Sequence, residues 1–414
     1  MAPSSNPNPK SAWAIFPIGL ATALSLTGDA TLYSVLPTHY ADAGIALASV
    51  GVILSVNRFI RLLTNGPAGW LFDRVTNRRL VFLGSLVLGI FSTMLYALTP
   101  SFEILFVARL LWGLAWSGIW IGGTAIVLQM APPAQRGHWV GIYQMWFFFG
   151  SAVCSLAGGV LTDWVGYANG LWLGVIVATM SAVIAALTLS AQHANNRITP
   201  AITTNWRASL TLDWRGMSSA MWATAIAQGI NRMATAGIVG ATLGLVVQQN
   251  FGTAIHLGTV PVGVASVTGA LLAARTTIGL ISAPIAGTLS DRMGGRWGLL
   301  ALSLVLGGAG MAILPVPQIT ALIFGMLASS LSSGGVQALS TALVGDLSPA
   351  QEHGKHLAIF NIAGDLGSAI GPIIAYALLP ITGLSAVYLV CAVLMTLTGV
   401  WSSRFGTKSF AKST

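Results

Sequence analysis

Charged residues are scarce in this chain. Only 7% of its 414 residues are Asp, Glu, Lys or Arg, whereas 55% are hydrophobic. Water-soluble domains carry about 25% charged residues, so the composition argues against an ordinary soluble protein. Cysteine is scarcer still. The two cysteines, Cys154 and Cys391, both lie inside apolar stretches, which argues against a disulfide framework and against a structural metal site built on thiolates.

The signatures of several enzyme classes are also absent from the sequence. It has no Gly-x-x-x-x-Gly-Lys-Ser/Thr loop, so we do not expect this chain to hydrolyse ATP. No cluster of His and Cys has the spacing of metal ligands, and no serine nucleophile elbow occurs. We therefore predict that the chain is not an enzyme and that it uses no cofactor and no metal.

What the chain does have is a series of long apolar runs. A helix of about 20 apolar residues spans the ~30 Å of hydrocarbon in a bilayer, and these runs lack the alternation of barrel strands. We predict an all-α membrane protein with twelve transmembrane helices. The predicted spans are residues 13–37, 48–71, 80–99, 102–130, 138–162, 168–190, 216–247, 258–288, 297–314, 317–345, 355–380 and 383–404.

The basic residues outside these spans indicate the topology. The net charge is +9. If the N-terminus is placed in the cytoplasm, every basic residue outside the spans falls on a cytoplasmic segment or at the edge of a span, as the positive-inside rule requires. This distribution favours a lipid bilayer over nucleic acid as the partner. We predict a multi-pass protein of the plasma membrane or bacterial inner membrane with both termini in the cytoplasm.

The chain contains an internal repeat. The segment GWLFDRVTNRR at 69–79 returns as GTLSDRMGGRW at 287–297, and GSAVCS at 150–155 returns as GSAIGP at 367–372. A polar interval lies between the copies, so we predict two pseudo-symmetric six-helix bundles with a substrate site between them near the membrane midplane. The predicted parts are a cytoplasmic tail at 1–12, bundles at 13–190 and 216–404, a cytoplasmic linker at 191–215 and a second cytoplasmic tail at 405–414.

Five arginines lie inside the apolar runs. An arginine at the bilayer centre costs ~3 kcal/mol or more, so we expect these residues to line an aqueous cavity, to pair with acids or to hold an anion. Only two acids, Asp29 and Asp365, lie within the spans, so three arginines would lack an acidic partner even if both acids pair. The five are Arg58, Arg61, Arg109, Arg232 and Arg275.

Neutral polar residues accompany the arginines at helical spacing in both halves of the chain. This pattern predicts one shared site. The planar guanidinium fork binds two oxygens at once, which suits a carboxylate or phosphate group. The predicted substrate-binding residues are Asn57, Arg58, Arg61, Gln228, Asn231, Arg232, Arg275 and Asn361. A purely structural role, in which the guanidinium bonds backbone carbonyls, is the alternative for Arg58 and Arg61.

The repeated loop carries a family signature. The pattern Gly-x-x-x-Asp-Arg-x-x-x-Arg-Arg at 69–79 is similar to the signature of major facilitator superfamily transporters, although Asn77 replaces their usual glycine. The resemblance implies a latch that holds one conformation by charge pairing; a simple topology anchor is the alternative. The glycines would allow close helix approach, and the aspartates would bond a helix N-terminus. The predicted latch residues are Gly69, Asp73, Arg74, Arg78, Arg79, Gly287, Asp291 and Arg292.

A second motif resembles the 12-helix drug/proton antiporter branch of that superfamily. Arg109-x-x-x-Gly113 in the fourth span is similar to a motif of its proton-coupled exporters. The resemblance implies that Asp29 and Arg109 act together in proton coupling, with Asp365 as a second candidate proton carrier. A static ion pair is the alternative. The fifth span departs from the exporter pattern, because it keeps the Gly158–Gly159 pair but lacks the preceding Gly-Pro.

These patterns predict secondary active transport of a small organic solute by alternating access, coupled to protons. We expect a monomer. An organic anion is one substrate class, and export of amphipathic compounds by a multidrug/proton antiporter is the alternative. For the latter, the tryptophans at 112, 116 and 120 and the aromatic cluster at 146–149 offer an aromatic wall, unless they serve only packing. A non-transporting membrane receptor or scaffold is the alternative of another class.

Overall fold

The computed structural model describes residues 15–98, 100–189, 217–257, 259–293, 295–349 and 352–410. The predicted tail at 1–12 and the predicted linker at 191–215 lie outside these residues. The first half of the chain forms α2 (Phe16–Ser25), α3 (Thr27–Val35), α4 (Val50–Arg74), α5 (Arg78–Leu98), α6 (Phe102–Met130), α7 (Arg136–Val165) and α8 (Tyr167–Thr188). Short 3₁₀ turns, η1 (Leu47–Ser49) and η2 (Pro133–Gln135), precede α4 and α7.

The second half is also helical. It forms α11 (Ser219–Arg232), the π-helical segment η3 (Met233–Val239), α12 (Gly240–Phe251), α13 (Val264–Met293), α14 (Arg296–Ile313), α15 (Ile319–Leu347) and α16 (His353–Phe410). Between α12 and α13 lies an antiparallel hairpin of β1 (Ala254–Leu257) and β2 (Val260–Gly263). The prediction that residues 258–288 form one span is therefore wrong at its start, because Val260 and Val262, two β-branched residues, lie in a strand that pairs with β1 before the helix begins.

The helical membrane architecture is confirmed. Within the described residues, ten helical segments are long and apolar enough to cross a bilayer. One of them, in α16, contains two helices that meet at Gly383, where φ is 75°. The first predicted span forms α2 and α3, which are separated at Leu26 and fall outside those ten. The count of twelve stays a prediction.

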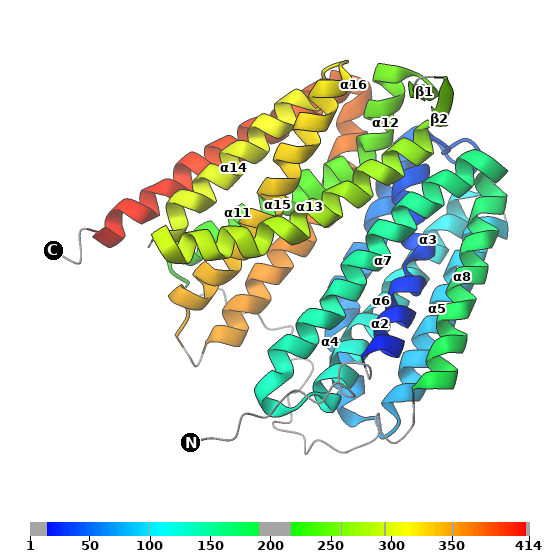
Figure 1. The fold of residues 1–414 in the computed structure, drawn as a ribbon, viewed down its shortest axis with the longest axis horizontal. Helices are drawn as coiled ribbons and strands as arrows, with labels where there is room; N and C mark the ends of the chain where they lie inside the picture. Colours follow the sequence, from blue (N-terminus) through cyan, green and yellow to red (C-terminus); the bar gives the residue numbers. More distant parts are fainter. Residues whose placement is uncertain are drawn as a thin grey trace.

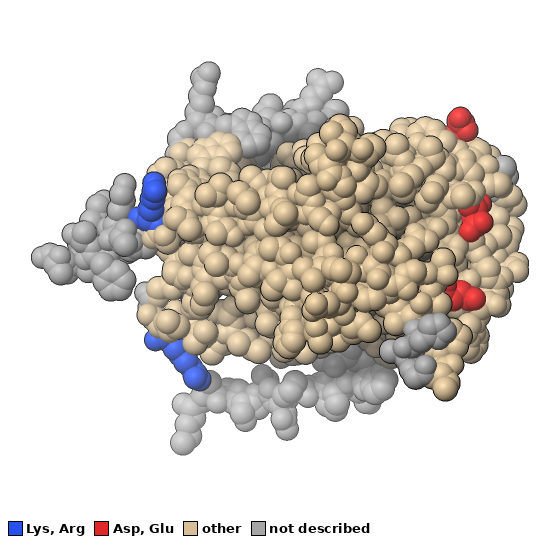
Figure 2. Space-filling view, turned by 90° about the horizontal axis from the view of Figure 1, so that it is seen from above, with Lys and Arg blue, Asp and Glu red and all other residues tan. Residues whose placement is uncertain are grey.

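The helices pack as two groups, one from each half of the chain. In the first group α6 packs on α4 and α5, and in the second α14 packs on α15 and α16. Figure 1 shows the two groups approaching each other near the β1–β2 hairpin and diverging toward the opposite end, where α16 finishes. We call the end that carries the hairpin the hairpin end. In Figure 2, basic residues gather at one end of the molecule and acidic residues at the other, with an uncharged band between them.

The two halves touch through α7 on α13 and α4 on α16. Glycine makes the first contact possible: a Cβ at Gly159 would lie 2.1 Å from the carbonyl oxygen of Ala265. Any other residue at this position would force the helices apart. The contact involves the C-terminal part of α7 and the N-terminal part of α13, so it holds the halves together at the hairpin end.

Candidate functional site

The predicted pair of Asp29 and Arg109 is present in the structure. Asp29 lies on α3 and Arg109 on α6, and the guanidinium donates to the Asp29 carboxylate. The Arg109 side chain is fully buried, whereas that of Asp29 keeps 20% of its surface exposed. Arg109 Nε also donates to the carbonyl of Ile53 at 3.1 Å. Two hydrogen bonds therefore hold the Arg109 guanidinium in place, whereas the Asp29 carboxylate stays partly exposed.

The spacing of the Arg109-x-x-x-Gly113 motif has a structural reason. A Cβ at Gly113 would lie 2.6 Å from the carbonyl oxygen of Asn57 on α4. The glycine lets α6 approach α4 closely, one turn from Arg109. Asn57 Nδ2 donates to the Asp29 carboxylate at 3.3 Å. Asn57 therefore contacts the acid and not the other predicted substrate-binding residues.

Tyr33 completes this cluster, and the sequence analysis did not identify it. Its ring lies under two guanidinium groups, 4.9 Å from Arg58 and 5.7 Å from Arg109, and its hydroxyl donates to the carbonyl of Leu54 at 2.9 Å. Such cation–π contacts stabilise arginines in desolvated surroundings. The available signal was its position one helical turn after Asp29 on the same face.

Arg58 reaches across to the other half. It lies on α4, and its guanidinium donates to the carbonyl of Ala236 in η3 at 3.2 Å and to the carbonyl of Ser368 in α16. Ser368 stands four residues before Pro372, which has no N–H to donate, so this carbonyl is free of its usual helical partner. In this conformation Arg58 satisfies backbone groups, as the structural alternative predicts.

Arg61 and Arg232 differ from Arg58. Both are half-buried, and neither makes a hydrogen bond or an ion pair within the part of the chain that the structure describes. The charges that act on Arg232 are those of Asp365, Arg58 and Arg61, so cations from α4 and α11 lie within electrostatic reach of one another. That these residues form one substrate site stays a prediction.

Arg275 on α13 completes a group of four cations. It donates to the carbonyl of Thr235 at 3.0 Å, and its Nε has no partner among the described residues. Arg232 and Arg58 lie within electrostatic reach of it. We call Arg58, Arg61, Arg232 and Arg275 the arginine cluster. Two of its members come from each half of the chain.

The remaining predicted substrate-binding residues, Gln228, Asn231 and Asn361, lie in the second half. Gln228 donates to Gln337, and Asn231 donates to the Ser333 carbonyl at 3.4 Å. The side-chain oxygens of Gln228 and Asn231 have no partner within the described residues. Asn361 on α16 is exposed. Sequence reasoning missed Gln337, although a glutamine inside an apolar span was the available signal.

Asp365 does not neutralise the cluster by direct contact. It is half-buried on α16 and acts on Arg232 electrostatically, but it forms no ion pair with an arginine in the described ranges. Asp29 is bound to Arg109, which lies outside the cluster as defined. The cluster therefore keeps an excess of positive charge.

The predicted latch loop is only partly engaged in this conformation. Arg78 is buried and donates to the Phe72 carbonyl at 2.7 Å and to Gln129 at 2.9 Å, and Arg79 donates to the Ala186 carbonyl. Asp73 is exposed. Apart from its chain neighbours and the nearby backbone of its own helix, no described atom lies within 4 Å of a Cβ built at Gly69 or Gly287. The prediction that these glycines permit a close helix approach is therefore wrong for this conformation.

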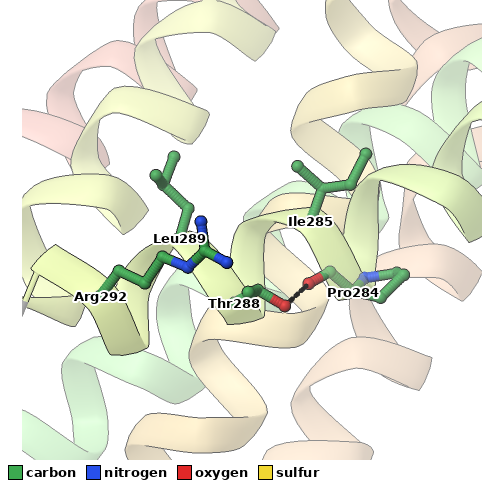
Figure 3. Close-up of a pocket in the computed structure, with 5 residues that line it drawn as sticks. All are labelled: Pro284, Ile285, Thr288, Leu289 and Arg292. Carbon is green, nitrogen blue, oxygen red and sulfur yellow. Dashed lines mark hydrogen bonds between the residues drawn. The ribbon is translucent and has the colours of Figure 1, made fainter.

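In the second copy of the loop, Arg296 bridges two acids. It contacts Asp291 at 3.0 Å and Asp346 on α15 at 2.8 Å. Arg292 instead borders a pocket of about 350 Å³ together with Pro284, Ile285, Thr288 and Leu289. Figure 3 shows that these residues all project from α13. One helix cannot enclose a solute, so this pocket is not a candidate substrate site.

The tryptophan stripe on α6 is packed within the first half. Trp112 and Trp116 stack with ring centroids 6.0 Å apart, and Trp116 and Trp120 stack at 5.9 Å. Trp112 and Trp116 are buried, at 1% and 6% exposed. In this conformation the stripe is part of a bundle core rather than an aromatic wall for a solute.

The family model for the Major Facilitator Superfamily matches residues 18–274 and again residues 224–411. The chain belongs to this superfamily. It is accordingly a multi-pass membrane protein and not an enzyme. The comparisons do not assign it to the drug/proton antiporter branch, which stays a prediction.

Curated relatives match part of the chain. A probable 4-methylmuconolactone transporter of Cupriavidus pinatubonensis is 28% identical over 155 residues, which are 36% of this chain and 36% of that protein. A probable galactarate/D-glucarate transporter of Escherichia coli is 25% identical over 177 residues, which are 40% of this chain and 39% of that protein. The matched stretches thus span well under half of the relatives' own length.

Solved structures match almost the whole chain. A bacterial homolog of the human lysosomal transporter Spinster, in an inward-facing and unoccupied conformation, superposes with a TM-score of 0.77 at 14% identity, covering 97% of this chain and 99% of that one. The human organic anion transporter MFSD10 gives a TM-score of 0.63 at 17% identity, covering 95% and 100%. At these identities the likeness shows the shared fold alone.

Proposed function

We propose that this protein is a secondary active transporter that carries a small organic anion by alternating access. The observation that carries the proposal is the arginine cluster, which draws two cations from each half and includes two that lack a hydrogen bond or ion pair within the described residues. Guanidinium groups in this setting suit a carboxylate or phosphate. A relative named as a probable galactarate/D-glucarate transporter supports this substrate class.

The arginines of the cluster repel one another. Two like charges about 6 Å apart repel by roughly 3 kcal/mol at an effective dielectric constant near 20. Only two acids, Asp29 and Asp365, act on the four cations of the cluster, and Asp29 is bound to Arg109, so the cations repel one another. An anion bound among them would relieve that repulsion. It would also link the two halves, as a substrate site in an alternating-access transporter must.

The same proposal assigns proton coupling to Asp29 and Arg109. Asp29 is the group of this pair that keeps an exposed surface, so protons can reach it. Protonation would remove the charge that binds Arg109 and would loosen the contact between α3 and α6. Asp365 remains the second candidate carrier, because it faces Arg232 without a direct ion pair.

The conformation fits one stage of such a cycle. The halves are joined at the hairpin end and diverge at the other end, and the basic residues of the loops favour a cytoplasmic position for that other end. The open side would then face the cytoplasm. The latch loop at 69–79 would engage only when the cytoplasmic ends of α4 and α16 come together, which agrees with the exposed Asp73.

Transport itself is the test of this proposal. Purified protein in proteoliposomes should exchange labelled organic acids but not lipophilic cations of similar size, and an imposed pH gradient should change the rate of net uptake. Absence of flux for every acid in the panel would favour the receptor or scaffold alternative. Flux of cations alone would favour the multidrug antiporter.

One cross-half contact at the hairpin end can be tested separately. Asp163 lies in the last turn of α7, and its carboxylate accepts hydrogen bonds from the backbone N–H of Ser266 at 2.7 Å and from the Ser266 hydroxyl at 2.6 Å. Ser266 lies in the first turn of α13, so Asp163 caps a helix of the opposite half, where the helix dipole favours a negative charge. This contact must break if the hairpin end opens.

Asp163→Ala is expected to destabilise the present conformation by about 1–2 kcal/mol, the usual value of a helix cap, which is a shift of roughly 5- to 30-fold in the conformational equilibrium. Spin labels placed on the two halves near the hairpin end should report a larger population of long distances. Asp42→Ala, which removes an exposed acid, is the matched control. Equal distance distributions for Asp163→Ala and the wild type would exclude this gating role.

A further inference from the structure

Two pockets lie along the same helix, α13. The first has a volume of about 350 Å³ and lies at the end of the helix that carries Arg292. Its lining residues are Pro284, Ile285, Thr288, Leu289 and Arg292. The second has a volume of about 510 Å³ and lies between α7 and α13; we call it the α7/α13 pocket. From α13 it is lined by Thr276, Thr277 and Leu280.

These two pockets belong to one groove. Side chains four positions apart form a ridge on an α-helix, and adjacent ridges enclose a groove. One ridge of α13 consists of Thr276, Leu280, Pro284, Thr288 and Arg292, and the ridge beside it consists of Thr277, Ile281, Ile285 and Leu289. Every residue that α13 contributes to either pocket lies on one of these two ridges. We call the space between the ridges the α13 groove.

The α13 groove faces away from the interior of the second half. Ser282 and Ser290 lie on the other side of α13 and are buried, and Ser282 Oγ would lie 2.0 Å from a Cβ at Gly334 of α15. On the groove side, Ile281 and Ile285 keep 55% and 60% of their surface exposed. In a multi-pass membrane protein, large apolar side chains exposed along a spanning helix meet the hydrocarbon of the bilayer. The groove is therefore open to lipid.

The groove is apolar except for one cation at its end. Its three threonine hydroxyls each donate to a carbonyl of α13 one turn earlier, at 2.9, 3.0 and 2.9 Å, so none of these hydroxyl protons is left for a ligand. Arg292 forms no ion pair within the described residues, because Arg296 takes the neighbouring Asp291. Figure 3 shows the Arg292 side chain extending toward Leu289 and Thr288. The groove thus joins a surface for hydrocarbon to an unpaired positive charge.

The length of the groove matches one leaflet of a bilayer. The rise of an α-helix puts Leu280 about 18 Å along the axis from Arg292. Half of the hydrocarbon core of a bilayer is about 15 Å thick. An acyl chain whose headgroup lies beside Arg292 would therefore end in the α7/α13 pocket, against Phe149 and Met145 of α7.

We propose that the α13 groove binds an anionic phospholipid, with the phosphate on Arg292 and one acyl chain running along α13 into the α7/α13 pocket. By the positive-inside rule the lipid belongs to the cytoplasmic leaflet. A free anion in water would gain nothing from the apolar part of the groove, whereas a phospholipid uses both its charge and its hydrocarbon. This site is separate from the arginine cluster and does not depend on the proposed function.

Native mass spectrometry of the purified protein tests the headgroup contact. Phosphatidylglycerol, which is anionic, should bind the wild type more tightly than phosphatidylcholine with the same acyl chains, which has no net charge. Arg292→Gln should weaken phosphatidylglycerol binding about fivefold, the usual effect of one arginine at the membrane surface. Arg74→Gln is the matched control and should bind as the wild type does. Arg74 holds the same place in the first copy of the loop, but it stacks on Trp70 at 4.4 Å and lines neither pocket.

A photoreactive lipid tests the path of the acyl chain. Phosphatidylglycerol with a diazirine at the end of one chain, added in trace amounts to phosphatidylcholine nanodiscs, should label Met145 or Phe149, and unlabelled phosphatidylglycerol should compete. Ala152→Phe, which fills the α7/α13 pocket, should lower this labelling. Val153→Phe should not, because Val153 does not line the pocket.

Three results would overturn the lipid site. The first is equal phosphatidylglycerol binding by Arg292→Gln and the wild type. The second is labelling that spreads over all exposed apolar helices or resists the competitor. The third is a dimer of the protein that excludes the lipid, which would make a second copy of the chain the occupant of the groove. Each of these results leaves the proposed transport of an organic anion standing, because none involves the arginine cluster.

Discussion

Arg109→Gln is expected to abolish transport and to lower the free energy of unfolding by about 3–5 kcal/mol, the cost of breaking a buried ion pair from one side. The Arg109 side chain is fully buried, and its guanidinium contacts the Asp29 carboxylate and the Ile53 carbonyl. Removing the cation leaves a charged acid facing glutamine in the first half. Proteoliposome uptake and thermal unfolding of the purified variant measure the two effects.

The double variant Asp29→Asn/Arg109→Gln separates structure from coupling. It removes both charges, so most of the lost stability should return. Transport driven by a pH gradient should stay absent, because the proposed proton carrier is gone. Asp29→Asn alone should lose the response to the pH gradient while substrate exchange without a gradient persists. A single Asp29→Asn variant that still responds to the gradient would show that the pair is static.

The second large effect is expected at the arginine cluster. Arg61→Ala and Arg232→Ala should each weaken anion binding by about 10- to 100-fold, since a hydrogen bond to a charged group contributes roughly 1.5–3 kcal/mol. These two residues have no hydrogen-bond or ion-pair partner in the described part of the chain, so their removal should leave folding intact. Calorimetric titration of an organic acid into detergent-purified protein measures the affinity.

Three further arginine substitutions serve as comparisons for this prediction. Arg232→Lys keeps the charge but loses the planar fork, so it should fall between the wild type and Arg232→Ala. Arg136→Ala, which removes an exposed cation at the start of α7, should bind as the wild type does. Arg58→Ala should act mainly on conformation, because Arg58 holds carbonyls of the opposite half. Equal affinities across Arg232→Ala and the wild type would remove Arg232 from the site.

Much of this arrangement could be predicted from the sequence, because membrane spans and charge pairs leave strong local signals. The span predicted at 102–130 coincides with α6, and the predicted contact of Asp29 with Arg109 is present. The span follows from its length and apolar composition. The pair follows from the free-energy cost of an unpaired charge in lipid, which favours contact between a buried acid and a buried base.

Other features depend on tertiary packing and could not be predicted in this way. Arg58 donates to the backbone carbonyls of Ala236 in η3 and of Ser368, which precedes Pro372 by four residues. The spacing of residues in the sequence does not show which side chain will reach these carbonyls. The same holds for Asp163, which has its partner on the opposite half. The open space beside Gly69 belongs to one conformation of a moving protein.

The most direct measurement is the location of a bound brominated carboxylate, such as 4-bromobenzoate, by anomalous X-ray scattering from crystals of this protein. We expect the carboxylate to lie among Arg61, Arg232 and Arg275, between the two halves. A bromine found only on the lipid-facing surface, or no ordered bromine while Arg61 and Arg232 are paired with acids of the protein, would contradict it.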